Sequence, residues 1–243
     1  MSGQRPIQVE MVENGEALAR RVADWLLQLA GAKRGPFSLC LSGGSTPRTL
    51  YRLLATAPYQ GAFPWAQTHL FFGDERFVPA GDALSNYRMV REALIDHASI
   101  PPANVHPVPT EGESVEAAAA DYARTLEMFH GSGRLDPAHP LFDVTLLGLG
   151  EDGHTASLFP GTAVLEEQTK WVAAVVGAKP EPRITLTYPA LESSRHTVFL
   201  VTGEGKREML RRLVEGDQTL PAARINPVGA LTVICDRAAA GSP

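Results

Sequence analysis

The chain alternates short apolar segments with stretches in which apolar residues recur at helical spacing. The segments 37–41 (FSLCL) and 142–147 (FDVTLL) have the length and composition of buried strands, whereas Leu18, Val22 and Leu26 recur every four residues. Buried strands that alternate with amphipathic helices are typical of βα units. The sequence therefore predicts an α/β fold, a Rossmann-like open and mainly parallel sheet flanked by helices.

The same pattern predicts the remaining elements. Further strands are expected at 69–72, 171–176, 184–187, 197–201 and 231–235. Helices are expected from the Asn14 cap to Gly31, from the Thr46-Pro47 cap onward, and at 86–97, 115–129 and 204–214. No linker rich in Gly, Ser or like charges divides the chain, so we expect a single domain over residues 1–243.

The net charge limits the kinds of partner that we expect, and the cysteines indicate the cell compartment. The formal net charge is −5, which disfavours nucleic acid and anionic membranes as partners. The longest charge-free stretch, 53–73, contains prolines and polar residues and is unsuited to a bilayer, and residues 1–12 lack the pattern of a secretory signal. Cys40 and Cys235 lie in apolar strand-like runs and are expected to be buried free thiols. We therefore expect a cytoplasmic protein.

Three of the expected strands end in turns rich in glycine or charge: 42–45, 73–76 and 148–154. In an open α/β sheet, ligands bind outside the carboxyl ends of the strands. The sequence therefore predicts that these turns converge on one crevice, although they are far apart along the chain.

The first turn, SGGST, suits an anion or a polar sugar. Gly43, Gly44 and Ser45 present backbone N–H groups at the start of a helix, without obstruction by side chains. The spacing of a P-loop is absent. A tight strand-to-helix turn capped by Thr46 explains the same residues equally well.

The second turn, GDER, places two acids beside an arginine. A solvated turn with a local ion pair is the usual explanation for such a triplet. Because this turn follows an apolar strand, a ligand-binding role is as well supported. Arg76 would then hold either a substrate oxygen or one of the two acids.

The third turn, GLGEDGH, carries the clearest chemistry. Asp152 and His154 are two residues apart, so in an extended segment their side chains point the same way. Histidine is a common general base, and a neighbouring carboxylate can orient it and stabilise its protonated form. The alternative is a structural aspartate and a surface histidine in a glycine turn. The GxGxxG spacing lacks the context of a dinucleotide-binding fingerprint.

Two later cations could bind phosphate: Arg183, which opens the segment RITLTYP, and Lys206, at the start of a helix. Taken singly, each is better explained as a surface cation. No zinc-ligand spacing and no GxSxG elbow occur, so no metal and no serine nucleophile are predicted.

Together these motifs resemble the 6-phosphogluconolactonase family over nearly the whole chain. The resemblance rests on LSGGSTPRTLY (41–51), FFGDERFVP (71–79), SNY (85–87), FDVTLLGLGEDGHTASLFPG (142–161), PRITLTYPAL (182–191), TGEGKREML (202–210) and LPAARINP (220–227). It implies hydrolysis of 6-phospho-D-glucono-1,5-lactone, the second step of the oxidative pentose phosphate pathway, without metal or organic cofactor. It also implies a fold related to glucosamine-6-phosphate deaminase and ribose-5-phosphate isomerase.

The resemblance also implies roles for individual residues. His154 is similar to the catalytic base and Asp152 to its neighbour in the site, and Arg76 is similar to an arginine that contacts substrate. The implied substrate-binding residues are Gly43, Gly44, Ser45, Arg48, Arg183 and Lys206. Of these, Arg48 falls where relatives often place a basic residue near the substrate phosphate.

Two other functions remain open. The first is an amino-sugar-phosphate isomerase or deaminase on the same fold, but the acid that follows the histidine in that family is replaced here by Ser157-Leu158-Phe159. The second is a non-catalytic sugar-phosphate sensor, which needs a DNA-binding module that the first 36 residues are too short to supply. The sequence does not determine the oligomeric state, for which we expect a monomer.

Overall fold

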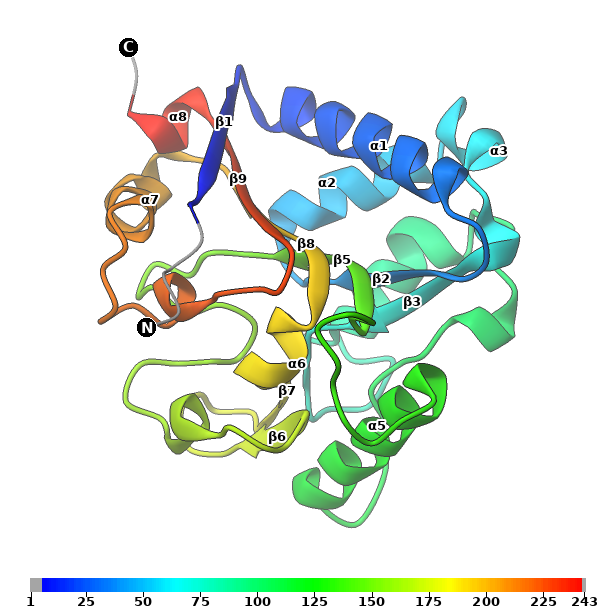
Figure 1. Cartoon of the computed structure of the whole chain (residues 1–243), viewed down its shortest axis with the longest axis vertical. Coiled ribbons are helices and arrows are strands. Elements are labelled where there is room, and N and C mark those ends of the chain that lie inside the picture. Colours follow the sequence, from blue (N-terminus) through cyan, green and yellow to red (C-terminus); the bar gives the residue numbers. More distant parts are fainter. Residues whose placement is uncertain (1–5, 242–243) are drawn as a thin grey trace.

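A six-stranded parallel sheet forms the centre of the computed structural model, which describes residues 6–241 (Figure 1). The strand order is β1-β9-β8-β5-β2-β3, and every neighbouring pair is parallel. The strands are β1 (Gln8–Val12), β2 (Phe37–Leu41), β3 (Thr68–Phe72), β5 (Phe142–Leu147), β8 (Ser194–Val201) and β9 (Ala230–Asp236). The predicted open, mainly parallel sheet is confirmed.

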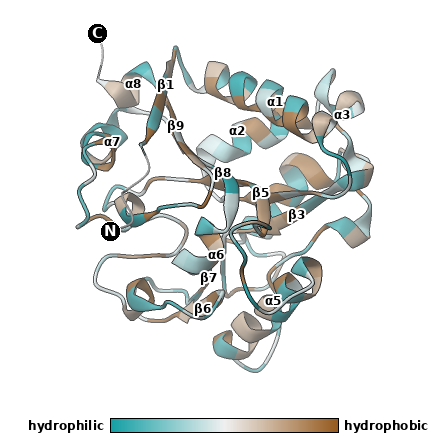
Figure 2. Ribbon diagram, in the orientation of Figure 1, coloured by the Kyte–Doolittle hydropathy of each residue, from teal (hydrophilic) through white to brown (hydrophobic). Residues whose placement is uncertain are grey.

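Helices lie on both faces of this sheet, and the longer ones bury an apolar stripe. In Figure 1, α1 and α2 lie on one face and α5 and α6 on the other; Figure 2 shows the helices with hydrophilic and hydrophobic residues alternating. The helices are α1 (Gly15–Ala32), α2 (Ser45–Leu54), α3 (Tyr59–Ala62), α4 (Asn86–Val90), α5 (Val115–His130), α6 (Tyr188–Glu192), α7 (Arg207–Val214) and α8 (Arg237–Ala240). A π-helical turn, Arg91–Ile95, extends α4.

A second, three-stranded sheet was not expected from the sequence. It consists of β4 (Asp74–Arg76), β7 (Arg183–Leu186) and β6 (Val172–Val175), all antiparallel to their neighbours. The expected strands 171–176 and 184–187 therefore form a separate sheet. The segment that joins β6 to β7 is too short for the crossover that a parallel pair requires, so the two strands pair antiparallel.

The order of the strands reverses between β2 and β5. From β2 the chain continues to β3 on one side, whereas from β5 it continues to β8 and β9 on the other. A crevice outside the carboxyl ends of the strands is expected at such a point. The turns that follow β2 and β5 are the first and third turns singled out in the sequence.

Two buried tyrosines hold the strand ends that lead into this region. The hydroxyl of Tyr51 accepts from the backbone N–H of Ser42 at 3.0 Å and donates to its carbonyl oxygen at 2.9 Å. Tyr122 makes the equivalent pair of hydrogen bonds to Phe72 at the end of β3. Burial raises the pKa of both phenols, so they remain neutral and can serve as both donor and acceptor.

The predicted N-cap residue is confirmed for α1 and is wrong for α2. Asn14 caps α1, and its side chain accepts from the backbone N–H of Ala17 at 2.9 Å. Thr46, expected to cap α2, lies inside the helix instead, and Gly44 is the N-cap without a side-chain hydrogen bond. The Thr46 hydroxyl lies 2.6 Å from the hydroxyl of Thr202, so this tertiary contact replaces the local cap.

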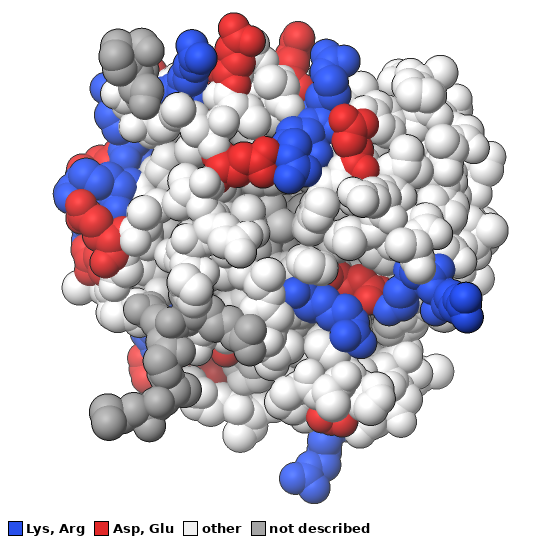
Figure 3. Space-filling view, turned by 45° about the horizontal axis from the view of Figure 1, so that its top comes forward, with Lys and Arg blue, Asp and Glu red and all other residues white. Residues whose placement is uncertain are grey.

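The cysteines, the helices and the surface charges can be compared with the predictions from the sequence. Cys40 and Cys235 are buried free thiols, as predicted. No helix in residues 6–241 is long and apolar enough to cross a membrane. On the face in Figure 3, Lys and Arg side chains lie beside Asp and Glu rather than forming one basic patch. The predicted absence of a signal rests partly on residues 1–5, which lie outside the described residues, and the cytoplasmic location and single domain stay predictions.

Candidate active site

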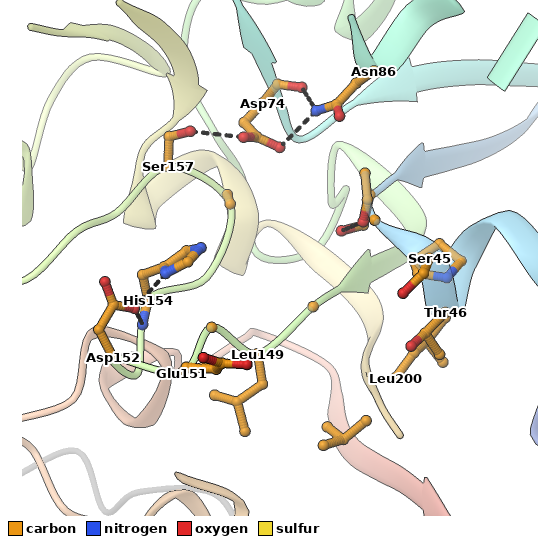
Figure 4. Close-up of a pocket in the computed structure, with 18 of the residues that line it drawn as sticks. Ser45, Thr46, Asp74, Asn86, Leu149, Glu151, Asp152, His154, Ser157 and Leu200 are labelled. Atoms are coloured by element: carbon orange, nitrogen blue, oxygen red, sulfur yellow. Dashed lines mark hydrogen bonds and ion pairs between the residues drawn. The ribbon is translucent and has the colours of Figure 1, made fainter. Parts of the chain in front are cut away.

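A cavity of about 700 Å³ lies at the carboxyl ends of β2 and β5, where the strand order reverses (Figure 4). All three turns singled out in the sequence contribute to its wall, as the convergence of parallel strand ends predicts. The predicted residues that line it are Gly43, Gly44, Ser45, Arg76, Asp152, His154, Arg183 and Lys206.

Arg48 is the exception among the predicted residues. It lies on α2, whose buried face consists of Pro47, Leu50, Tyr51 and Leu54, and its side chain is exposed. Arg48 lines a separate depression of about 150 Å³, together with residues of α4 and its π-helical extension. At helical spacing, position 48 points away from the sheet, so the structure does not bring Arg48 to the cavity.

Asp152 and His154 are in direct contact. Asp152 Oδ1 contacts the ring Nδ1 of His154 and also accepts from its backbone N–H at 3.1 Å. Burial raises the pKa of Asp152, but the hydrogen bonds from His154 outweigh it, so this pKa lies below the usual range. Because an ionised carboxylate only accepts hydrogen bonds, the contact favours the neutral tautomer of His154 with the proton on Nδ1 and the lone pair on Nε2.

The loop that carries these two residues is closed on itself. The backbone N–H of Gly150 donates to the carbonyl oxygen of His154 at 2.8 Å, and Thr155 Oγ1 donates to the carbonyl oxygen of Gly148 at 2.9 Å. The His154 ring also lies 4.7 Å, between centroids, from the ring of Phe159. The imidazole is therefore held on two sides, and its side chain remains 29% exposed to the cavity.

Arg76 and Arg183 face each other across β4 and β7. Burial lowers the pKa of Arg183, and the charge of Arg76 lowers it further. The Nε atoms of both are buried and have no hydrogen-bond partner among the described residues. Arg76 donates instead to the backbone oxygen of Leu84, and no described acid forms an ion pair with it. Arg183 Nη2 forms an ion pair with Glu181 Oε2 at 3.4 Å, so its Nε is the donor that remains free. Two neighbouring guanidinium groups with free donors form a site for an anionic ligand.

Lys206 and the start of α2 add further positive potential. Lys206 Nζ is 4.0 Å from Glu151 Oε1, at the limit of an ion pair. The first N–H groups of α2 lack a side-chain cap, and Ser45 and Thr46 line the cavity. A helix N-terminus with a nearby lysine suits a phosphate group.

Sequence reasoning missed several residues of the cavity wall. Asp74, Asn86 and Ser157 line it and are hydrogen-bonded to one another through Asp74 (Figure 4). All three occur within the motifs on which the resemblance rests. Those motifs could have pointed to them, although the sequence analysis assigned them no role. Lys179 also lines the cavity, with Nζ 4.0 Å from Asp152 Oδ2 and 5.1 Å from the Phe159 ring centroid. No motif pointed to Lys179.

A sequence profile of the family described as glucosamine-6-phosphate isomerases/6-phosphogluconolactonase matches residues 13–234. The chain belongs to this family. A 6-phosphogluconolactonase of Synechocystis sp. is 40% identical over 240 residues, with 96% of each chain covered.

Two solved structures have the same fold as this chain. The 6-phosphogluconolactonase from Trypanosoma cruzi superposes with a TM-score of 0.84 at 29% identity, covering 98% of both chains. A monomeric glucosamine-6-phosphate deaminase superposes with a TM-score of 0.82 at 21% identity, covering 97% of this chain and 99% of that one. The expected relationship to the deaminase fold is confirmed, whereas that to ribose-5-phosphate isomerase stays a prediction.

Proposed function

We propose that this protein hydrolyses 6-phospho-D-glucono-1,5-lactone to 6-phospho-D-gluconate, the second step of the oxidative pentose phosphate pathway. The observation that carries the proposal is the Asp152–His154 contact in a cavity that also contains Arg76, Arg183 and Lys206. The cavity thus offers a base and several cations for a phosphate. The relatives named 6-phosphogluconolactonase support the same reaction.

In the proposed mechanism, His154 Nε2 removes a proton from a water molecule, whose oxygen attacks C1 of the lactone. Asp152 holds the proton on Nδ1 and stabilises the imidazolium that forms. The tetrahedral oxyanion is stabilised by Arg76 or by backbone N–H groups of the glycine turns. When the bond between C1 and the ring oxygen breaks, the imidazolium returns its proton to that oxygen.

We assign the phosphate of the substrate to Arg183, Lys206 and the N-terminus of α2, including the backbone of Gly43, Gly44 and Ser45. A dianion needs several donors, and these groups line one cavity. The mechanism uses no metal and no organic cofactor. Among residues 6–241, no three His, Cys, Asp or Glu side chains form a group that could hold a metal ion.

The test is the loss of the lactone followed in time, with and without the protein. The uncatalysed control is essential because the lactone also hydrolyses in water. We expect rapid turnover of the phosphorylated lactone and poor turnover of unphosphorylated gluconolactone. Release of ammonia from glucosamine-6-phosphate, without lactone turnover, would instead support the deaminase alternative. Tight binding of sugar phosphates with neither reaction would support the sensor.

A further inference from the structure

The cavity contains a carboxylate that the proposed mechanism does not use. Asp74, the first residue of β4, lines the cavity wall above Asp152 and His154 in the view of Figure 4. Its Oδ2 accepts from Ser157 Oγ at 2.7 Å, and its Oδ1 lies 3.3 Å from Asn86 Nδ2. No ion pair between residues of the described chain involves Asp74. Burial lowers the pKa of Arg183 and the charge of Asp74 opposes that shift, so a cation is nearby although no ion pair forms. The carboxylate is held by two neutral donors and keeps acceptor capacity in the cavity for a ligand.

Asn86 is held in place from three directions. Its Nδ2 also donates to the carbonyl oxygen of Asp74 at 3.0 Å. The carboxylate of Glu75, only 1% exposed, accepts from the backbone N–H groups of Asn86 and Tyr87 at 2.7 Å each. A Cβ on Gly43 would lie 2.1 Å from Asn86 Oδ1, so the amide fits because residue 43 is a glycine. The Asn86 side chain is therefore fixed before any ligand arrives.

Ser157 is fixed in a similar way. It is fully buried, and its backbone N–H donates to Thr185 Oγ1 of β7 at 3.2 Å. Its hydroxyl has one proton, which it donates to Asp74. Both neighbours thus act as donors that orient the Asp74 carboxylate and leave part of its acceptor capacity for a ligand.

The chemistry of a carboxylate decides what that ligand group is. An ionised carboxylate only accepts hydrogen bonds, and it repels the oxygens of a phosphate. The hydroxyl groups of a sugar ring are donors. The ester carbonyl of a lactone has no proton to donate and cannot pair with Asp74.

We propose that Asp74, oriented by Ser157 and Asn86, accepts a hydrogen bond from a ring hydroxyl of the substrate and makes the cavity selective for polyhydroxylated lactones. This inference rests on the proposed function, whose lactone carries hydroxyl groups at C2, C3 and C4. Asp74 is then a specificity-determining residue, and Ser157 and Asn86 are positioning residues.

The test removes the hydroxyl groups one at a time. The 2-deoxy, 3-deoxy and 4-deoxy forms of the phosphorylated lactone are compared with the parent, using wild type and Asp74→Asn. For wild type, kcat/KM falls about 10- to 100-fold on one deoxy lactone, the range for a hydrogen bond to a charged group. For Asp74→Asn, kcat/KM on the parent lactone falls by a similar factor. On that same deoxy lactone the variant and wild type differ little, because the hydrogen bond is already absent.

The control variant is Asp121→Asn, since Asp121 is an exposed residue of α5 outside the cavity. It should show the wild-type pattern on every lactone. Ser157→Ala keeps the Asp74 carboxylate and removes one of its donors, so it should give the same pattern with a smaller loss. The unfolding temperature of Asp74→Asn shows whether that variant folds. If it does not fold, Ser157→Ala is tested in its place.

Two results would overturn the inference: wild type that turns over all four lactones equally well, or an Asp74→Asn loss of the same factor on all four. A wild type inactive on the parent lactone would instead contradict the proposed function. In that case, calorimetric binding of 6-phosphogluconate and its deoxy forms tests Asp74 without turnover. Equal affinities of wild type and Asp74→Asn for every form would then contradict the hydroxyl contact.

Discussion

Gly150 lies directly against the ring of His154. A Cβ on Gly150 would be 2.0 Å from Nδ1 and 2.3 Å from Cε1 of His154, far inside van der Waals contact. The same two residues are joined by the backbone hydrogen bond from Gly150 N to His154 O. Because the ring also contacts Asp152 and Phe159, it cannot move aside without losing those contacts. The position of the imidazole therefore depends on the absence of a side chain four residues earlier.

We expect Gly150→Ala to lower kcat about 100-fold, the effect of a displacement of roughly 1 Å in a catalytic group. KM should change little, since Arg183 and the N-terminus of α2, which we assign to the phosphate, lie on other elements. The matched control is Gly31→Ala in α1, where an added Cβ meets nothing within 4 Å. Steady-state kinetics give kcat and KM for both variants and for wild type. Wild-type kcat in Gly150→Ala would show that the ring position is not critical.

His154→Ala should lower kcat by about 10²- to 10⁴-fold, the usual contribution of general-base assistance. KM should stay close to that of wild type, because other residues bind the substrate. In wild type, kcat/KM should decline on the acid side as the imidazole is protonated, and this decline should be absent from the variant. His139→Ala, which removes an exposed histidine, is the control. A folded His154→Ala protein with near-normal kcat would contradict the mechanism.

Arg183→Ala should cost about 2–4 kcal/mol in kcat/KM for the phosphorylated lactone, because a charge-assisted contact is lost. The loss should be much smaller for unphosphorylated gluconolactone, which makes no such contact. Arg124→Ala, an exposed arginine of α5, should behave as wild type on both. An equal loss on the two lactones would mean that Arg183 does not bind the phosphate.

Stability should fall at acid pH because of a partly buried histidine pair. His69 Nδ1 and His106 Nε2 are 3.0 Å apart. Burial and the neighbouring His69 lower the pKa of His106 from 6.5 to about 4, and burial lowers the pKa of His69. The unfolded chain therefore binds protons more readily than the folded one. The stabilisation is complete above about pH 6.5 and is lost as the pH falls towards 4.

For these half-exposed rings, we expect the loss between pH 7 and pH 4 to be about 1–2 kcal/mol in the free energy of unfolding. Urea unfolding at several pH values measures it. His106→Phe keeps a ring on Phe71, which His106 stacks on at 4.4 Å between centroids, and should have a weaker pH dependence. His97→Phe should keep the wild-type dependence, because His97 is exposed and its ring contacts a backbone oxygen rather than a carboxylate. Identical pH profiles for His106→Phe and wild type would contradict the assignment.

Dialysis against a strong chelator should leave the rate of lactone hydrolysis unchanged. The physical reason is the donor set: a hydrolytic zinc ion usually has three protein ligands, and residues 6–241 contain no such group of His, Cys, Asp or Glu. The rate of lactone hydrolysis is measured before and after dialysis, and again after single divalent ions are added back. Loss on chelation with recovery by one ion would contradict the prediction.

Local sequence signals predicted much of the fold and the site. The extents of β2 and β5 follow from their apolar runs, and the start of α1 follows from Asn14, because these depend on neighbouring residues. The pairing of Asp152 with His154 was expected for the same reason, since they are only two residues apart. Signals that act over a few residues are visible in the sequence itself.

Contacts between distant segments required the tertiary structure. The strand order and the small sheet that places Arg183 opposite Arg76 depend on pairing between segments about a hundred residues apart. The same applies to the contact between Asp74 and Ser157, and to the outward direction of Arg48. The sequence by itself predicted most of the elements, the three turns and the pair Asp152 and His154 that one of them carries. Only the packing of helices on the sheet decided which side chains share the cavity, because that depends on the burial of surfaces contributed by the whole chain.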